Sequence, residues 1–207
     1  MLSVLVPVKA QQCEQYRKTH RNKPVHLTLY YLPLCPHCQD YITKQLNETI
    51  PRFTPTELKV EFVPLSNNVP QNELIDKQDN AGKFDIDKFE ACAVHYLKTV
   101  WKFLVCVEDD LEDPEQARNL CYKKLRIPHS TQNKIHACAS GELGHKLLKQ
   151  NSDRFEGIKP DSANDGVPWI TVQGSSLLRL QSMLRETSSL MNTICLIHEG
   201  EPPRACR

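Results

Sequence analysis

The spacing of apolar and polar positions divides the chain into a β-α-β start, a helical middle part and a shorter return to β structure. An apolar, β-prone run predicts a strand at residues 26–32. Apolar residues at helical spacing predict a helix over residues 36–48, and alternation predicts a second strand at residues 58–65. Since a helix separates these strands, we expect them to lie parallel, joined by a right-handed crossover.

The middle of the chain has the periodicity of amphipathic helices. Residues 67–84 are polar, have no period and predict a loop. Apolar positions from Ile86 to Leu104 predict one long helix. Asp113-Pro114-Glu115 marks the start of the next helix. Its expected inward residues are Ala117, Leu120, Cys121 and Leu125, and further helices are predicted near residues 131–139 and 141–150.

The last part of the chain returns to β character. Asn164-Asp165-Gly166 predicts a turn, and residues 168–174 predict a strand that runs into a second turn. A final helix is expected at residues 177–194. The tail from Cys195 to Cys206 has the composition of a loop that a disulfide could close.

Length and charge limit the classes of function. The 207 residues can form one sizeable domain, or a small core that carries an insertion. Acids and bases nearly balance at a formal net charge of +1, which argues against nucleic acid or an anionic membrane as a partner. No apolar stretch approaches the length of a transmembrane helix. The first ten residues are apolar but lack a basic start, so we expect a truncated or misassigned leader, or a disordered terminus.

The strongest chemical signal is Cys35-Pro36-His37-Cys38, placed where the first strand meets the first helix. Pro36 suits the first helical position. The thiolate is the attacking form of cysteine, and a helix N-terminus together with a protonated His37 would favour it at Cys35. We therefore expect Cys35 to be the exposed nucleophile and Cys38, one turn along on the buried face, to be the resolving thiol.

Two other interpretations of this motif stay open. A CxxC pair can be half of a zinc site, but structural zinc needs four ligands and the chain has no second CxxC. The pair could also be an inert structural disulfide. We favour the redox interpretation and expect no metal site.

Nine cysteines scattered along the chain favour an oxidising compartment with structural disulfides. Seven lie outside the CxxC pair, so at least one must be free, bonded to another chain or outside the mature protein. We expect the four in the helical part to form disulfides or to pack in a core, and their pairing cannot be read from the sequence. The disulfide candidates are Cys92, Cys106, Cys121, Cys138, Cys195 and Cys206, with Cys13 in addition to them. Asn47-Glu48-Thr49 is a glycosylation acceptor sequence, which is consistent with secretion.

Several stretches together resemble one known family. They are Leu29-Tyr30-Tyr31 through Cys38, Phe89-Glu90-Ala91-Cys92, Val105-Cys106-Val107-Glu108, Cys138-Ala139-Ser140-Gly141 and Val167-Pro168-Trp169-Ile170-Thr171-Val172. In this order and spacing they resemble the gamma-interferon-inducible lysosomal thiol reductase (GILT) family. The resemblance runs from about residue 25 to Cys206.

The resemblance implies an α/β, thioredoxin-like fold with a helical insertion between the βαβ start and a C-terminal ββα unit. It divides the chain into a leader or disordered segment at 1–24, a first core part at 25–66, a loop and helical insertion at 67–164, and a second core part with the tail at 165–207. The chain departs from the family signature before Cys92: only Gln78 and Cys92 match, while Lys77 and Phe84 stand at cysteine positions and Asp79 and Asn80 at His-Gly positions. We therefore expect a divergent member, in which the role of this stretch is open.

The resemblance also assigns roles to residues. Cys35 and Cys38 match the family's redox pair, with Pro36 and His37 as supporting residues. Val167-Pro168 matches the loop that holds a cis proline beside the active cysteines in thioredoxin-like folds, so we expect a cis bond there. The alternative is an ordinary trans proline that opens a strand.

The implied activity is reduction of disulfides in proteins by a thiol-disulfide oxidoreductase, in an acidic endosomal or lysosomal setting or outside the cell. No cofactor is expected beyond the redox-active disulfide, which a small thiol or a protein reductant would recycle. A thiolate stabilised by the intervening Pro-His also stabilises the reduced pair and would make it a better oxidant. A disulfide oxidase or isomerase of the secretory pathway is therefore one alternative. The altered stretch at 77–92 and the weak leader favour another, a secreted binding protein that kept the fold and lost turnover.

Overall fold

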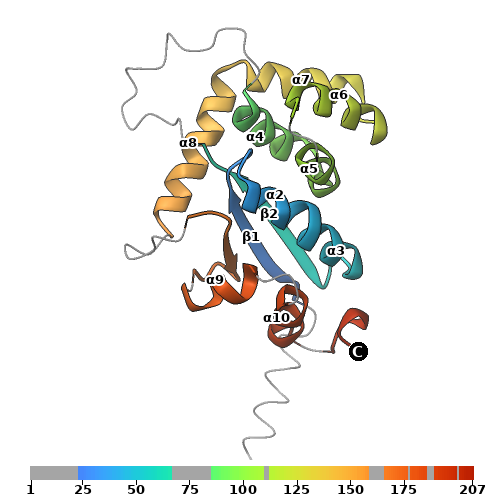
Figure 1. The fold of residues 1–207 in the computed structure, drawn as a ribbon, viewed down its shortest axis with the longest axis vertical. Helices are drawn as coiled ribbons and strands as arrows, with labels where there is room; N and C mark the ends of the chain where they lie inside the picture. The colour runs from blue at the N-terminus through green and yellow to red at the C-terminus, as the bar shows by residue number, and fades with distance from the viewer. Residues whose placement is uncertain are drawn as a thin grey trace, which may run out of the picture.

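The computed structural model describes residues 23–66, 85–109, 112–158, 166–176, 178–185, 189–199 and 201–207. Figure 1 shows a small sheet with helices packed on it and a separate group of helices along one end. The elements are β1 (Val25–Tyr31), α2 (Pro36–Asp40), a π-helical segment (Tyr41–Leu46), α3 (Asn47–Thr49), a 3-10 turn (Ile50–Arg52), β2 (Leu58–Pro64), α4 (Ile86–Tyr96), α5 (Val100–Glu108), α6 (Pro114–Lys124), α7 (His129–Ala139), α8 (Glu142–Glu156), β3 (Trp169–Val172), α9 (Leu178–Arg185), α10 (Ser189–Ile197) and a 3-10 turn (Arg204–Cys206).

The sheet of the described residues has the strand order β2-β1-β3. β1 and β2 are parallel, as predicted, and β3 runs antiparallel to β1. Leu29 in the central strand is paired with Phe62 on one side and with Ile170 on the other. The alternation of β1 places Leu27, Leu29 and Tyr31 in the main core.

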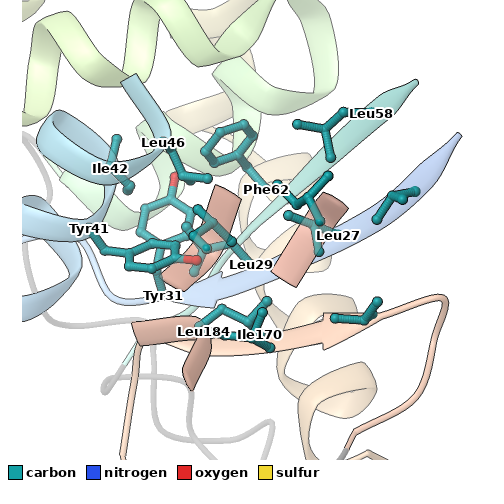
Figure 2. Packing of buried hydrophobic residues seen from close by; sticks show 14 of the residues in the cluster. Leu27, Leu29, Tyr31, Tyr41, Ile42, Leu46, Leu58, Phe62, Ile170 and Leu184 are labelled. Atoms are coloured by element: carbon teal, nitrogen blue, oxygen red, sulfur yellow. The ribbon is translucent and has the colours of Figure 1, made fainter. Parts of the chain in front are cut away.

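The helix that follows the cysteine motif covers this core. Figure 2 shows Tyr41, Ile42 and Leu46 extending toward side chains of the strands. All three are buried in the same cluster as Leu29 and Tyr31. Burial of apolar surface on this scale is the main force that holds the first helix against the sheet.

Strand side chains that lie outside the main core, among them Tyr30, Val63 and Trp169, form a smaller core with Phe155 of α8. Tyr30 lies with its ring centroid 5.4 Å from that of Phe155, and Phe155 in turn contacts Trp169 of β3. Arg154 makes a two-pronged ion pair with Glu61, with N–O distances of 2.8 and 2.9 Å. Helix α8 is thereby joined to the edge strand β2 by both apolar and charged contacts.

Helices α4 to α7 surround a second core of their own. Phe103 and Tyr122 stack at its centre with ring centroids 5.3 Å apart, and Phe89 packs against both rings at steeper angles. Two disulfides tie this group together: Cys92–Cys138 joins α4 to α7, and Cys106–Cys121 joins α5 to α6. The third disulfide, Cys195–Cys206, closes the C-terminal tail onto α10.

The predicted single helix from Ile86 to Leu104 is wrong. The backbone at Leu97 is extended (φ −97°, ψ 122°), which ends α4, and α5 begins at Val100. This break turns α5 so that Leu104 packs in the main core while Phe103 packs in the second core. The apolar pattern hid the break because residues 100 and 104 keep helical spacing within α5.

Other boundaries differ in detail. The first helix is continuous from Pro36 but is π-helical at Tyr41–Leu46, and α8 continues to Glu156. Leu120 is 59% exposed rather than inward, because α6 turns Arg118 and Tyr122 toward the core. Beyond β3, the described part of the expected second C-terminal strand is a single bridge between Val172 and Ser175.

Some predictions concern residues that the structure does not describe. They are the leader with Cys13, the loop at 67–84 with the altered family signature, and the turn residues Asn164 and Asp165. The final helix is described as α9 and α10, on either side of residues 186–188. In the described parts of the chain, every helix is too short or too polar to cross a bilayer.

Candidate active site

A tight turn at the end of β1 presents Cys35. The Cys35 backbone N–H donates to the Leu32 carbonyl at 3.2 Å, and Leu34 between them has a φ of 64°, the left-handed region that a leucine rarely adopts. Cys35 is then the N-cap of α2, and its carbonyl accepts from the N–H groups of Cys38 and Gln39, both at 2.9 Å. Pro36 stands at the first helical position, as the sequence predicts.

The two cysteines of the motif differ in exposure. Both are thiols in this structure; Cys35 is partly exposed, whereas Cys38 is 0% exposed and lies in the main core. Burial raises the pKa of the Cys38 thiol far above its ordinary value. A reagent from solvent can therefore reach Cys35, and Cys38 can react only with a partner brought to it through Cys35.

A groove of about 400 Å³ begins beside the motif. It is lined by His37, Asp40, Tyr41, Lys44, Gln45, Val167, Pro168 and Arg185. The Val167–Pro168 peptide bond is cis. The fold thus brings the exposed His37 of the cysteine motif together with the Val167–Pro168 loop, although 130 residues of sequence separate them.

Side chains of α9 hold this loop in place. Arg185 donates from Nε to the Pro168 carbonyl at 2.7 Å and from Nη2 to the Gly166 carbonyl at 2.9 Å. Gln181 bonds both the N–H and the C=O of Ile170, at 2.9 and 2.7 Å. The position of Pro168 beside α2 therefore depends on polar contacts from α9.

Two glutamates are buried next to the core that contains Cys38 and Tyr31. Glu90 of α4 is 0% exposed and Glu108 of α5 is 3% exposed. The Tyr31 hydroxyl donates to Glu90 Oε2 at 2.6 Å. Burial raises the pKa of Glu90 well above its usual range, and it raises that of Glu108 to about 7, with contacts to the Glu90 carboxyl and the Gln39 amide offsetting part of the effect. The pair consequently holds protons at pH values where ordinary carboxyls are ionised.

From the raised pKa of Glu108, we predict that the free energy of unfolding decreases as pH rises. Because the pKa of Glu108 is about 7 in the folded state and 4.5 without burial, the folded state binds more protons between these values. The free energy of unfolding should therefore fall by up to about 3 kcal/mol for this group between pH 4.5 and pH 7.5. Urea denaturation across this range, with the disulfides intact, measures the slope. Glu108→Gln should flatten it, and an equal slope in the variant would contradict the assignment.

The remaining predicted residues lie outside the groove. The six disulfide candidates are all paired, in the three bonds described above. Asn47 is exposed on α3, while Thr49 of the same acceptor sequence is buried. Among the described histidines, cysteines and acidic residues, no group of three or more is arranged to hold a metal ion.

Several residues of the site were not predicted from the sequence. Leu34, which is 52% exposed beside Cys35, and Arg185 had no predicted role, and Glu90 and Glu108 entered only as members of the stretches that resemble the family. A signal for the two glutamates was present: Glu90 follows the inward Ile86 by four residues, and Glu108 follows the inward Leu104 by four. A carboxyl at an inward position of an apolar helix face is a reason to look for a buried acid.

The chain is similar in sequence to known proteins. The sequence profile of the family described as gamma interferon inducible lysosomal thiol reductase (GILT) matches residues 26–125. A gamma-interferon-inducible lysosomal thiol reductase of Carassius auratus is 28% identical and aligns with 95% of this chain and 76% of its own. A gamma-interferon-responsive lysosomal thiol protein of Arabidopsis thaliana is 28% identical over 88% of this chain and 75% of its own, and a Mus musculus thiol reductase of the same name as the first is 26% identical over 88% and 72%.

Solved structures share the fold. MdbA, a thiol-disulfide oxidoreductase from Actinomyces oris, superposes with a TM-score of 0.56 at 14% identity, over 83% of this chain and 79% of its own. The oxidoreductase NmDsbA1 from N. meningitidis gives 0.50 at 14% identity, over 86% and 83%. The predicted thioredoxin-like α/β fold with inserted helices is thereby confirmed.

Proposed function

Because residues 26–125 belong to the GILT family, we propose that this thiol-disulfide oxidoreductase reduces disulfides of unfolded or partly unfolded proteins through Cys35 and Cys38. The resemblance predicted from the sequence is confirmed, and identities of 26–28% fit a divergent member. The observation that supports this role is the difference in exposure between the two thiols. Cys35 is partly exposed at the start of a helix, and Cys38 is buried in the core.

The proposed reaction has two exchanges. The Cys35 thiolate attacks a sulfur of the substrate disulfide, and the other substrate sulfur leaves with the electron pair and takes a proton. Cys38 then attacks Cys35 Sγ, so that the Cys35–Cys38 bond forms and the second substrate thiol is released. The substrate disulfide has gained two electrons, which a small thiol or a protein reductant must return to the enzyme. No cofactor enters this cycle.

The groove beside His37 is the proposed place for the substrate chain. Its lining includes the exposed imidazole of His37, the ion pair between Lys44 and Asp40, and the Val167–Pro168 loop. An extended segment lying there would reach backbone groups of Val167. Such contacts do not depend on substrate side chains, which suits an enzyme for many unfolded proteins.

We propose an acidic endosomal or lysosomal setting, or secretion into one. The names of the relatives support it, as do three disulfides in a chain of this size. The buried glutamates support it independently, because they make the folded state more stable in acid. Glycosylation at the exposed Asn47 fits the same route.

The test is reduction of a denatured disulfide protein with a small thiol as donor, from about pH 4.5 to about pH 7.5, which brackets the titration of histidine. Turnover that persists at the acid end supports the proposal. Turnover only near neutrality would instead indicate an oxidoreductase of the secretory pathway, especially if the oxidised enzyme introduces disulfides into a reduced protein. Absence of turnover with every donor would indicate a binding protein.

A further inference from the structure

We propose that Arg185 is a positioning residue that makes the enzyme select disulfides carried by extended polypeptides over small-molecule disulfides. It fixes the backbone on both sides of Val167, so that the peptide groups of that residue are held ready for a substrate chain. The inference rests on the proposed function, because it concerns how the substrate of that cycle is recognised.

Two hydrogen bonds from the Arg185 side chain lie on either side of Val167. Nε donates to the Pro168 carbonyl at 2.7 Å, and Nη2 donates to the Gly166 carbonyl at 2.9 Å. The guanidinium carbon also lies 5.8 Å from the centroid of the Trp169 ring. Hydrogen bonds from a charged donor are about twice as strong as neutral ones, and a planar guanidinium holds two acceptors in a fixed geometry. The loop is therefore held in place both before and after Val167.

The backbone of Val167 itself is left for a ligand. Its N–H and C=O make no hydrogen bond with any residue that the structure describes. Val167 lines the groove that begins at His37, while its neighbour Pro168 is buried. An extended chain in the groove can therefore exchange backbone hydrogen bonds with Val167, as one strand does with another. A small disulfide has no such backbone and gains nothing from these contacts.

Arg185 is in turn bonded to the helix that carries the cysteine motif. Gln45 Nε2 donates to the Arg185 carbonyl at 2.6 Å. Gln45 is a buried residue of the π-helical segment that continues from α2, a kind of turn that is frequent at functional sites. Leu184, one residue before Arg185, is buried in the main core together with Ile170 of β3 (Figure 2). Arg185 thus connects the motif helix, the end of α9 and the Val167–Pro168 loop.

Loss of the guanidinium should therefore affect binding and not the chemistry of the thiol. Without it, the carbonyls of Gly166 and Pro168 lose their partner, and a substrate chain has to order the loop when it binds. The turn of Cys35 does not depend on these bonds, because the Cys35 N–H donates to the Leu32 carbonyl.

The experiment compares two substrates with the same reacting sulfurs, using the full chain with a Cys13→Ser background and the Cys35–Cys38 pair reduced. One is a short, extended, uncharged peptide whose single cysteine is joined to a thiopyridyl group. The other is mercaptoethanol joined to the same group. Attack by the Cys35 thiolate forms a mixed disulfide in both cases, and thiopyridone leaves with the electron pair and takes a proton. Its absorbance in stopped flow gives the half-saturating concentration and the maximal rate.

We expect Arg185→Gln to raise the half-saturating peptide concentration by about tenfold, with the maximal rate and the reaction of the small disulfide within about twofold of wild type. Arg185→Lys keeps the charge but cannot bridge two carbonyls, so it should behave like Arg185→Gln. Gln45→Met, which removes the bond to the Arg185 carbonyl, should shift the same concentration in the same direction by a smaller factor. Arg154→Gln also breaks two bonds of an arginine, but outside the groove, and should change neither substrate.

Methylation of the peptide tests whether its backbone is the recognised part. One methyl group is placed in turn on the backbone nitrogen of the substrate cysteine and of each neighbouring residue. At least one of these peptides should bind about tenfold more weakly to the wild-type site, with little further loss in Arg185→Gln, because both changes remove the same contact.

The inference is overturned if Arg185→Gln keeps the wild-type preference for the peptide, if Arg185→Lys restores it, or if no methylated peptide binds more weakly. It is also overturned if the effects of methylation and of Arg185→Gln add in full. If the Arg185 variants do not fold, Gln45→Met decides by raising or keeping the half-saturating concentration. A wild-type site that reacts equally well with both substrates would refute this inference and leave the proposed function intact, whereas no release from either substrate would contradict the proposed function itself.

Discussion

Replacing Cys38 by serine is expected to stop turnover after the first exchange and to leave Cys35 covalently joined to its substrate. The partly exposed Cys35 can still attack, but a serine hydroxyl cannot displace the substrate sulfur. Multiple-turnover reduction should fall by about a thousandfold or more. Non-reducing gel electrophoresis and mass spectrometry of the variant, mixed with a denatured disulfide protein, should show the mixed disulfide in stoichiometric amount.

Cys35→Ser is the matched control, because it changes the same motif by the same atom. With Cys13 replaced by serine in both variants, Cys35→Ser should lose turnover to the same extent but form no mixed disulfide, since the remaining thiol of the motif is 0% exposed. Trapping by the Cys35→Ser variant and not by the Cys38→Ser variant would reverse the assigned roles. Substantial turnover in the Cys35→Ser variant would falsify the redox role of the motif altogether.

Removing the Cys92–Cys138 disulfide should destabilise the protein by about 4 kcal/mol, because the bond closes a loop of 46 residues and so limits the freedom of the unfolded chain. Both cysteines are buried, so alanine is the appropriate replacement at each position. Urea denaturation of the Cys92→Ala, Cys138→Ala double variant at constant pH measures the loss.

The tail provides a comparison. Replacing Cys195 and Cys206 by alanine removes a bond with a sequence separation of 11, for which the same reasoning gives about 3 kcal/mol. A loss below about 1 kcal/mol on removing the Cys92–Cys138 bond would mean that packing of α4 against α7 is sufficient without it.

The β-α-β start could be predicted from the sequence because local signals there agree. Alternation in β1 and β2, helical spacing after Pro36 and the strand-helix-strand order all favour one parallel arrangement, which the structure confirms. The break at Leu97 could not be predicted, because the direction of α5 is set by tertiary packing. One side of α5 packs in the main core and another side packs in the second core. A periodic pattern carries no information about such a bend.

The two thiols of the candidate site could be predicted from the sequence, but the residues that hold the surrounding loops and helices in place could not. The spacing of Cys35 and Cys38 marks them as a pair, and their unequal burial follows from helix geometry. The pairing of the other cysteines depends on which helices meet, which local sequence does not encode. The same holds for Arg185, whose bonds to the Pro168 and Gly166 carbonyls span nearly twenty residues.

The two hydrogen bonds between Gln181 and Ile170 have a consequence for solubility. β3 is an edge strand of the described sheet, and the free N–H and C=O groups of an edge strand invite another chain to add to it. Here one glutamine side chain already occupies both groups of Ile170. An enzyme that handles unfolded chains meets many segments able to form β structure. For the unfolded substrates proposed above, the Gln181 amide makes the N–H and C=O groups of Ile170 unavailable as a template for strand addition.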